Sequence, residues 1–433
     1  MDTSLTIEEG KSGTKYRWAV LVLCFLLYLF DNYVMFIPGL TMSNIVEALG
    51  TDSAGGGLIS SATMLGAVIG CVLTGRIAST WGSRNTLTAM GIIIGVASFV
   101  CALSTSFWVW IVLRIIVGVG VGSMLGPCVK LAADHWGPKH RRMATAAILC
   151  SFSIAGLVAS FVTKMLIGFG YAYIYEFAAI AIIPSVLLLF MVPSDKLAKT
   201  DLESNGNEEV NVGFSSILDG NLKYVTIFGI MVSFFNMAGA WAMGTWIPSW
   251  LINVRGLSVD LMTNFSMVNY LGGFVGYFFW SWIGNKMGTA RALIVGYIAT
   301  AVAMVLYLLI PGTDILFYLG PVLYFCQAMN VLMSITFGEA FPRYIRAYGS
   351  STCFNVGRVG SIISPYTTAL VGTTFGLTAG LGMVPVFYGV GALFAGGLKY
   401  FVDIQQKKDA DDDASSSVVS NIASDGPSKP QME

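Results

Sequence analysis

Five ionisable side chains lie inside long apolar stretches of this sequence: Asp31, Arg114, Lys130, Glu176 and Arg358. Asp31 is the only charged residue in the stretch LVLCFLLYLFDNYVMFIPGL. A charged side chain in the middle of a bilayer costs roughly 2.5–3.5 kcal/mol on insertion scales, so such residues are retained when they are paired, line a water-filled cavity or carry function. Their types are those of a proton-binding acid and of cations that can hold an anion within a membrane.

Asp31 and Arg114 are expected to lie at a similar depth. At a rise of 1.5 Å per residue, Asp31 is about nine residues and Arg114 about seven residues from the outer end of its helix, so both lie roughly 10–14 Å below the same surface. We therefore expect an ion pair that couples the proton on Asp31 to the movement of Arg114. A purely structural ion pair is the alternative.

Arg358 lies in the stretch CFNVGRVGSIISP, twelve residues into its expected helix. That position is roughly 18 Å from the helix start and therefore near the midplane of the bilayer. No acid of the C-terminal half matches this depth, because Glu339 belongs to a helix end. A planar guanidinium suits a bidentate contact with a carboxylate, so we predict that Arg358 binds the carboxylate of a substrate. An ion pair with Asp31 or Glu176 across a cavity is the alternative.

The other embedded charges have simpler interpretations. Lys130 can extend to the headgroups, and Glu176 lies close enough to a helix end to be solvated there. We count Arg114 as a second residue that could contact the substrate. The five embedded charges then give the cavity a net positive charge, which favours an anionic substrate. Further residues that could line the cavity, or could instead bond neighbouring helices, are Asn236, Trp241, Tyr270, Gln327, Asn330 and Asn355.

Composition places most of the chain in a membrane. Of the 433 residues, 55% are hydrophobic and 11% are charged, and the mean hydropathy is +0.72. Soluble domains contain roughly 25% charged residues, so most of this surface should face lipid. The net charge is zero, which gives no reason to expect a nucleic-acid partner. Cysteines confined to apolar stretches and only two histidines predict neither a metal site nor a cofactor.

Twelve apolar stretches are long enough to cross a bilayer as helices. They lie near 17–40, 54–75, 86–105, 107–134, 143–168, 172–193, 223–251, 262–284, 290–310, 314–340, 347–373 and 378–402. Lysine and arginine gather in alternate connections and at both ends, which predicts cytoplasmic termini and an inner or plasma membrane location. The expected organisation is a cytoplasmic segment 1–16, a six-helix bundle 17–193, a cytoplasmic linker 194–222, a second six-helix bundle 223–402 and a disordered cytoplasmic tail 403–433.

The two halves repeat short motifs at nearly constant spacing. Arg142 and Arg346 both follow a Pro-x-x-x pattern and are 204 residues apart, and Gly82 and Gly288 are 206 apart. Duplicated halves in a membrane place a binding site at their interface, reached alternately from each side.

These motifs resemble those of the major facilitator superfamily. GRIASTWGSR resembles its signature between the second and third spans, and RIIVGVGVG resembles its fourth-span signature. HWGPKHRRMA and TWIPSWLINVRGLS are similar to motifs of anion:cation symporters, and YLFDNYV is similar both to these and to aromatic-acid/proton symporters. The resemblance implies an all-α membrane protein with twelve transmembrane helices in two pseudo-symmetric six-helix bundles. It also implies a set of gating residues at the cytoplasmic ends of the helices: Gly82, Arg84, Arg142, Asn285, Gly288, Glu339 and Arg346.

The sequence therefore predicts a monomeric secondary transporter that moves a small organic anion, a carboxylate, by alternating access in symport with protons. The alternatives are a carrier of a neutral solute such as a sugar or nucleoside, and a receptor of the same fold that does not transport. A membrane enzyme is disfavoured because no nucleophile–base pair and no intramembrane histidine is apparent. A channel would not need two matching halves.

Reporter fusions test the predicted topology. A fusion after Gly220 and a fusion at the C-terminus should both report the cytoplasm, because both positions follow an even number of predicted spans. Alkaline phosphatase activity, which requires an external location, at either position would contradict the topology.

Overall fold

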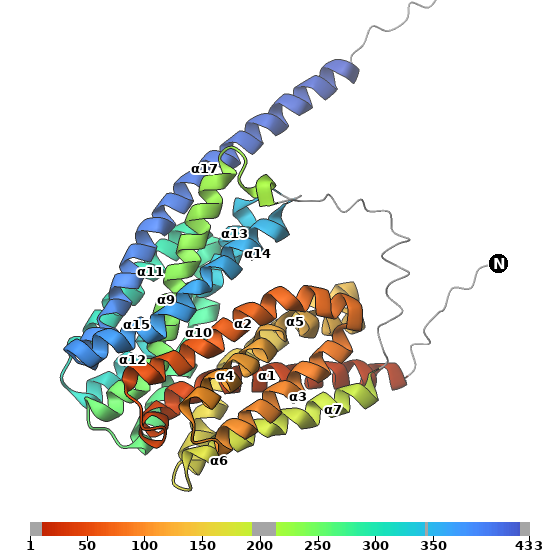
Figure 1. Cartoon of the computed structure of the whole chain (residues 1–433). Helices are drawn as coiled ribbons and strands as arrows, with labels where there is room; N and C mark the ends of the chain where they lie inside the picture. Colours follow the sequence, from red (N-terminus) through yellow and green to blue (C-terminus); the bar gives the residue numbers. More distant parts are fainter. Residues whose placement is uncertain (1–10, 193–213, 343–344, 425–433) are drawn as a thin grey trace, which may run out of the picture.

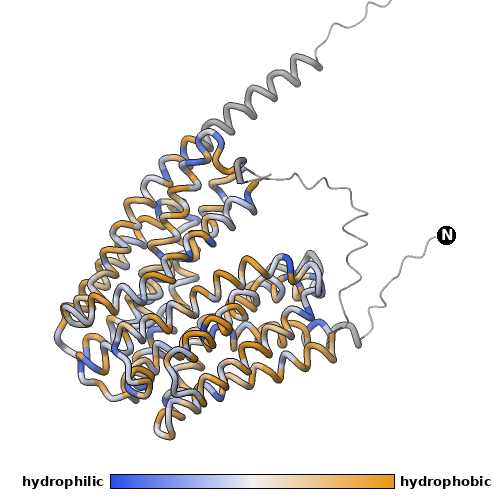
Figure 2. Tube along the Cα trace, in the orientation of Figure 1, coloured by the Kyte–Doolittle hydropathy of each residue, from blue (hydrophilic) through white to orange (hydrophobic). Residues whose placement is uncertain are grey.

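The structure is a computed structural model that describes residues 11–192, 214–342 and 345–424. The described residues fold almost wholly as helices (Figure 1). Ten helices or helix pairs among them are long and apolar enough to cross a membrane. Hydrophobic residues predominate along both groups of helices (Figure 2), and large side chains such as Phe190 and Leu393 remain exposed on the outer faces. Such faces suit lipid rather than water.

The first bundle contains the helices up to residue 191. They are α1 (Lys11–Ala48), α2 (Ser53–Trp81), α3 (Ser83–Leu103), α4 (Phe107–Gly122), α5 (Leu125–Leu166), α6 (Tyr171–Phe177), the short 3-10 helix η1 (Ala178–Ala181) and α7 (Ile182–Met191).

The second bundle follows the 3-10 helix η3 (Phe214–Ile217). Its elements are α9 (Leu222–Asn253), α10 (Val259–Met287), α11 (Thr289–Leu309), α12 (Thr313–Gln327), η4 (Ala328–Asn330), α13 (Val331–Ala340), α14 (Arg346–Gly357), α15 (Val359–Phe375), α16 (Leu377–Leu381) and α17 (Met383–Ser424).

These elements correspond to the twelve expected spans, although several spans are built from two or three consecutive helices. The two expected spans outside the ten apolar ones are α10 and the pair α14–α15. α10 carries polar residues such as Asn264 and Asn269, and the eleventh span is interrupted at Arg358. Both departures from an apolar helix occur in elements that face the cavity described below.

Three boundaries differ from those expected from the sequence. The break expected near 135–142 is absent, because α5 runs without interruption from Leu125 to Leu166. The break falls instead at Ser123, whose hydroxyl donates to the carbonyl oxygens of Val119 (2.8 Å) and Gly70 (3.0 Å). α1 begins at Lys11 rather than at 17, and α17 continues as a helix to Ser424, through much of the tail expected to be disordered. Most of the expected linker lies outside the described residues.

The same helix pairs pack in both halves. In the first bundle α2 packs on α4 and α1 on α5, while in the second α10 packs on α12 and α9 on α14 and α15. Between the bundles α2 packs on α15 and α5 on α10. α2 and α10 are the second helices of their halves, and α5 and α15 contain the fifth spans. Each second helix therefore packs on the fifth span of the other half, which matches the pseudo-symmetry expected from the repeated motifs.

Glycines allow the helices within a bundle to approach closely. A Cβ atom added to Gly118 of α4 would lie 2.1 Å from the carbonyl oxygen of Thr63 in α2, and one added to Gly66 would lie 2.1 Å from that of Ile115. Small residues at helix interfaces are the usual means of close packing in membranes, where lipid provides no hydrophobic drive between helices.

The bundles also meet at one end of the molecule. We call this the distal end: the end at which α1 ends and α2 begins, opposite the end from which the two termini leave (Figure 1). There a Cβ atom on Gly39 of α1 would lie 2.3 Å from the carbonyl oxygen of Gly244 in α9, and one on Gly57 of α2 would lie 2.7 Å from that of Pro365 in α15. Toward the termini the two bundles diverge in Figure 1.

The substitution Gly118→Ala tests the packing of α2 on α4. The new methyl group would overlap a backbone carbonyl, and overpacking of this kind costs about 1–3 kcal/mol. We expect a lower melting temperature of the purified protein in detergent, measured by intrinsic fluorescence.

Gly126→Ala is the matched control, because a Cβ atom at Gly126 would meet nothing within 4 Å. It should leave the melting temperature unchanged or raise it, since alanine favours helices over glycine. Equal melting temperatures for the two variants would contradict the close packing.

Candidate functional site

A cavity of about 370 Å³ lies where the two bundles face each other. The first bundle contributes side chains from α1, α2, α4 and α5, and the second contributes side chains from α9, α10, α12, α13, α14 and α15. Ligand pockets typically enclose about 300–1,000 Å³, so the cavity is suited to a small molecule.

Asp31 reaches this cavity from the middle of α1. Tyr28, Asn32 and Met35 also line it, and Tyr28 and Met35 have the spacing from Asp31 of one helix face. Asp31 is only 3% exposed, and its Oδ1 has no hydrogen-bond partner among the described residues. The neighbouring Asn32 donates to the carbonyl oxygen of Tyr28 (2.6 Å) and not to the acid. Burial of an ionised carboxylate without donors is costly, which makes Asp31 a candidate to bind a proton.

Arg358 reaches the cavity from the opposite bundle, at the junction of α14 and α15. The glycines beside it bring the junction against α9: a Cβ atom on Gly357 would lie 2.1 Å from that of Ser233, and one on Gly360 would lie 2.1 Å from the carbonyl oxygen of Phe234. The hydroxyl of Ser361 donates to the carbonyl oxygen of Arg358 at 2.6 Å. The local backbone is therefore held tightly while the side chain extends into the cavity.

The guanidinium of Arg358 is available to a ligand. Its carbon lies 5.4 Å from the centroid of the Phe354 ring. Among the described residues it forms no hydrogen bond and no ion pair within 4.0 Å, although the carboxyl of Asp31 lines the same cavity. Residues from different bundles and of opposite charge thus face one cavity.

Arg114 does not occupy its expected place. It is fully buried in the first bundle and is not among the residues that line the cavity. Among the described residues, the expected ion pair between Arg114 and Asp31 does not form. Its Nη1 donates to the carbonyl oxygen of Val34 at 3.4 Å, and its guanidinium carbon lies 4.7 Å from the Tyr175 ring and 5.4 Å from the Trp110 ring. Asp31 lines the cavity and Arg114 packs against aromatic rings inside the first bundle, so the two side chains point in different directions around their helices.

The other residues expected to bind substrate divide into two groups. Asn355 connects α14 to α2 instead of lining the cavity: its Oδ1 accepts from the Cys71 thiol (3.3 Å), and its Nδ2 donates to the Ser351 hydroxyl (3.0 Å). Those that line the cavity are Asn236, Trp241, Tyr270, Gln327 and Asn330.

Aromatic side chains form much of the cavity wall, and the sequence analysis missed most of them. Phe36 of α1 lies 4.9 Å from Tyr270 and 5.1 Å from Phe152, measured between ring centroids. Tyr324 lies 5.7 Å from Tyr270 on the other side. Tyr28 and Tyr277 complete this wall. Their helical spacing from Asp31 and Tyr270 could have identified these last two, but nothing in the sequence distinguishes the others from lipid-facing aromatics.

Six of the seven predicted gating residues lie at or beside helix ends, whereas Arg142 lies within α5, because no break interrupts that helix between Leu125 and Leu166. Gly82 and Gly288 take the same place in each half, between α2 and α3 and between α10 and α11, with φ angles of 81° and 88°. Only glycine adopts such angles readily, which explains why both halves carry it.

The remaining gating residues with described contacts bond within their own bundle. Arg84 donates to the carbonyl oxygen of Val192 (2.8 Å), and Arg346 donates to that of Phe341 (3.3 Å). Glu339 accepts from the hydroxyl of Thr289. Asn285 is exposed, and the side chain of Arg142 lies outside the described residues.

Two similar helical bundles around a shared central cavity define a secondary transporter that works by alternating access. Residues 21–365 match the sequence model of the Major Facilitator Superfamily. The chain belongs to this superfamily, and is therefore a multi-pass integral membrane transporter and not an enzyme.

Similar proteins of known function are carriers of organic acids by name. The chain is 24% identical to a gentisate transporter of Corynebacterium glutamicum over 91% of this chain and 90% of that protein. It is 23% identical to a cis,cis-muconate transport protein of Acinetobacter baylyi over 87% and 92% of the two chains. Among solved structures, a bacterial homologue of the human lysosomal transporter Spinster, in an inward-facing and unoccupied conformation, superposes with a TM-score of 0.74 at 16% identity and covers 90% of this chain and 98% of its own.

Proposed function

We propose that this protein transports a small organic anion, a carboxylate, across the membrane in symport with protons. The observation that carries the proposal is the guanidinium of Arg358, which faces the central cavity without a hydrogen-bonded partner among the described residues. Guanidinium groups bind carboxylates through two parallel hydrogen bonds. The similarity to the gentisate and muconate carriers supports the same class of substrate.

The charges of the cavity favour an anion when Asp31 holds a proton. In that state Arg358 is the charged residue of the lining, because the other lining residues are uncharged. A carboxylate neutralises the guanidinium, which otherwise remains a lone charge within the membrane. Binding of one proton and one anion adds no net charge to the cavity. The loaded carrier can therefore change conformation at low electrostatic cost.

The aromatic wall suits a flat, apolar substrate body. Phe36, Tyr270 and Tyr324 form consecutive tilted and edge-to-face contacts that span both bundles. Aromatic rings favour such arrangements with one another, so an aromatic acid can add a further ring to the series while its carboxylate reaches Arg358. The amides of Gln327 and Asn330 offer hydrogen bonds for polar substituents.

In this proposal the termini lie in the cytoplasm of a cell bounded by the plasma or inner membrane, and the carrier acts as a monomer. The segments 17–193 and 223–402 serve as the two moving bundles, and 194–222 joins them. With the termini in the cytoplasm, as proposed, the divergence of the bundles toward the termini (Figure 1) would make this an inward-facing state. A wet cavity on that side gives Asp31 access to cytoplasmic protons.

Substitution of Arg358 tests the substrate charge. Arg358→Gln should weaken the binding of a substrate carboxylate by roughly 10- to 150-fold, which corresponds to about 1.5–3 kcal/mol for a charge-assisted contact. Arg358→Lys keeps the charge but loses the planar fork, so it should also bind poorly. Binding of a panel of aromatic acids to purified protein, followed by the ligand-induced rise in melting temperature, measures the effect.

Lys130→Gln is the matched control, because it also removes one positive charge but from an exposed side chain outside the cavity. Its affinity should equal that of the unmodified protein. Full affinity in Arg358→Gln would reject the anion site, and loss of the folded protein in that variant alone would identify Arg358 as a structural residue.

Substitution of Asp31 tests the coupling proton. Asp31→Asn cannot exchange a proton, so accumulation driven by a pH gradient in proteoliposomes should be lost while exchange of labelled for unlabelled substrate continues. Asp314→Asn, which removes an exposed acid from the first turn of α12, should keep both activities. Accumulation with unchanged pH dependence in Asp31→Asn would place the proton site elsewhere.

A further inference from the structure

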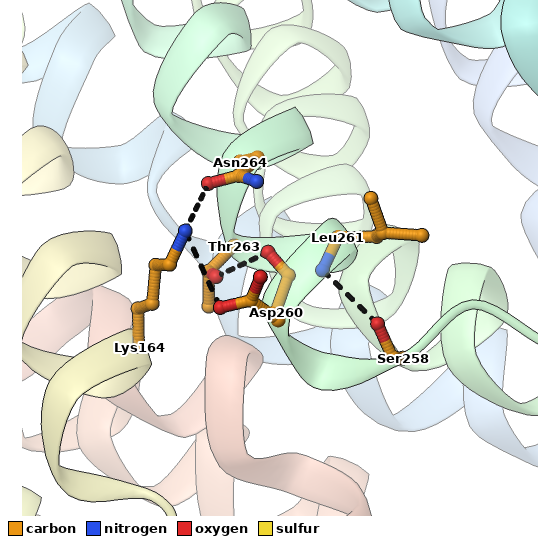
Figure 3. A network of polar contacts seen from close by, with 6 residues as sticks. All are labelled: Lys164, Ser258, Asp260, Leu261, Thr263 and Asn264. Carbon is orange, nitrogen blue, oxygen red and sulfur yellow. Dashed lines mark hydrogen bonds and ion pairs between the residues drawn. The ribbon is translucent and has the colours of Figure 1, made fainter.

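An ionic contact joins the two bundles at the distal end. Lys164, in the last turn of α5, places its Nζ 3.3 Å from Oδ1 of Asp260 in the first turn of α10. The same Nζ donates to Oδ1 of Asn264 at 2.9 Å, one turn further along α10 (Figure 3). One cation of the first bundle is therefore held by two acceptors of the second.

This is the only ion pair between the bundles in the part of the chain that the structure describes. The second ion pair among the described residues, between Lys399 and Asp403, lies within α17 and joins residues one turn apart. The central charges Asp31 and Arg358 line the same cavity without forming an ion pair within 4.0 Å. Direct charge–charge attraction between the halves is thus concentrated at the distal end.

The acceptors on α10 are held in place by their own helix. The Ser258 hydroxyl accepts from the backbone N–H of Leu261 at 3.3 Å and so caps the start of α10, and the Thr263 hydroxyl donates to the carbonyl oxygen of Asp260 at 2.9 Å (Figure 3). An acid in the first turn and a base in the last turn are each favourable with the helix dipole. Both charges therefore remain stable where they are when the contact between them is broken.

The surroundings show that the contact belongs to a closed end. Ser43 of α1 accepts at its hydroxyl from the amide of Asn253 in α9 at 3.2 Å, again across the interface. Gly39 and Gly57 approach the backbone of the second bundle at the same end. At the other end, Arg346 donates to the carbonyl oxygen of Phe341 within its own bundle.

We propose that Lys164, Asp260 and Asn264 form a distal latch, which stabilises the state closed at the distal end and must open in each transport cycle. The inference rests on the proposed alternating access but not on the nature of the substrate. Lys164 is 33% exposed and Asp260 64% exposed, so water can replace the contact. A latch of this kind biases the two states without locking the carrier in one of them.

Cross-linking at the distal end tests the latch. Cysteines placed at Ser43 and Asn253 in the full-length protein report closure, because these side chains touch across the interface. In proteoliposomes, Lys164→Gln should lower the rate of oxidative cross-linking by about 2- to 5-fold, the shift expected from an exposed ion pair. Lys164→Arg, which keeps the charge, should restore the rate. The cross-linked peptides are identified by mass spectrometry, since the chain has seven native cysteines.

Two further variants separate the latch from a general charge effect. Lys399→Gln removes the ion pair that does not span the interface. Its cross-linking rate should equal that of the protein that carries only the two cysteines at Ser43 and Asn253. Asp260→Asn should slow cross-linking as Lys164→Gln does, and the two together should have little more effect than either one, because they remove the same contact.

Unchanged cross-linking in Lys164→Gln, or fully additive effects of the two substitutions, would overturn the latch. Either result would leave organic-anion transport intact, since uptake by the unmodified protein is measured separately. Conversely, slower cross-linking in a protein that takes up no organic acid would support the latch and reject the proposed substrate.

Discussion

A charged side chain cannot face the hydrocarbon of a bilayer at low cost, and the arrangement of this protein follows from that constraint. Asp31 lies near the middle of α1 in the first bundle, Arg358 lies at the junction of α14 and α15 in the second, and both face the cavity between the bundles. Among the residues that the structure describes, neither has an ion-pair partner within its own bundle. The bundles must therefore stay together around the cavity, and the chemistry of the cavity is set by two residues that only the assembled fold brings near each other.

The two halves share a backbone plan but differ in chemistry. Gly82 and Gly288 adopt nearly the same φ at equivalent connections, and equivalent helix pairs pack within each half. The acid, however, comes from α1 and the guanidinium from the α14–α15 junction, which is not its structural equivalent. A repeated scaffold can thus support a site in which one bundle handles the proton and the other handles the anion, so that relative movement of the bundles changes the environment of both.

Contacts between the bundles differ in kind from contacts within them. Within a bundle, glycines such as Gly66 and Gly118 bring helices into close backbone contact along their length. Between the bundles, the distal end combines close glycine contacts with the solvated pairs Lys164–Asp260 and Ser43–Asn253. Solvated pairs contribute little net stability because water competes for both partners. An interface built in this way can close and reopen while each bundle remains intact.

The sequence alone was sufficient to predict a helical membrane protein of two similar halves, because hydropathy, loop charge and repeated motifs are properties of local sequence. It also identified Asp31 and Arg358, since a charge in an apolar stretch is visible without a structure. It predicted an ion pair between Asp31 and Arg114 that is absent from the described residues, because depth along a helix follows from residue number whereas direction around the helix depends on packing. Arg114 turns toward Tyr175 and Trp110 inside the first bundle. The Phe36–Tyr270 contact of the aromatic wall and the Lys164–Asp260 contact each join residues more than ninety positions apart in the chain. Only the tertiary structure could decide these contacts, because they depend on how two separately packed bundles face each other.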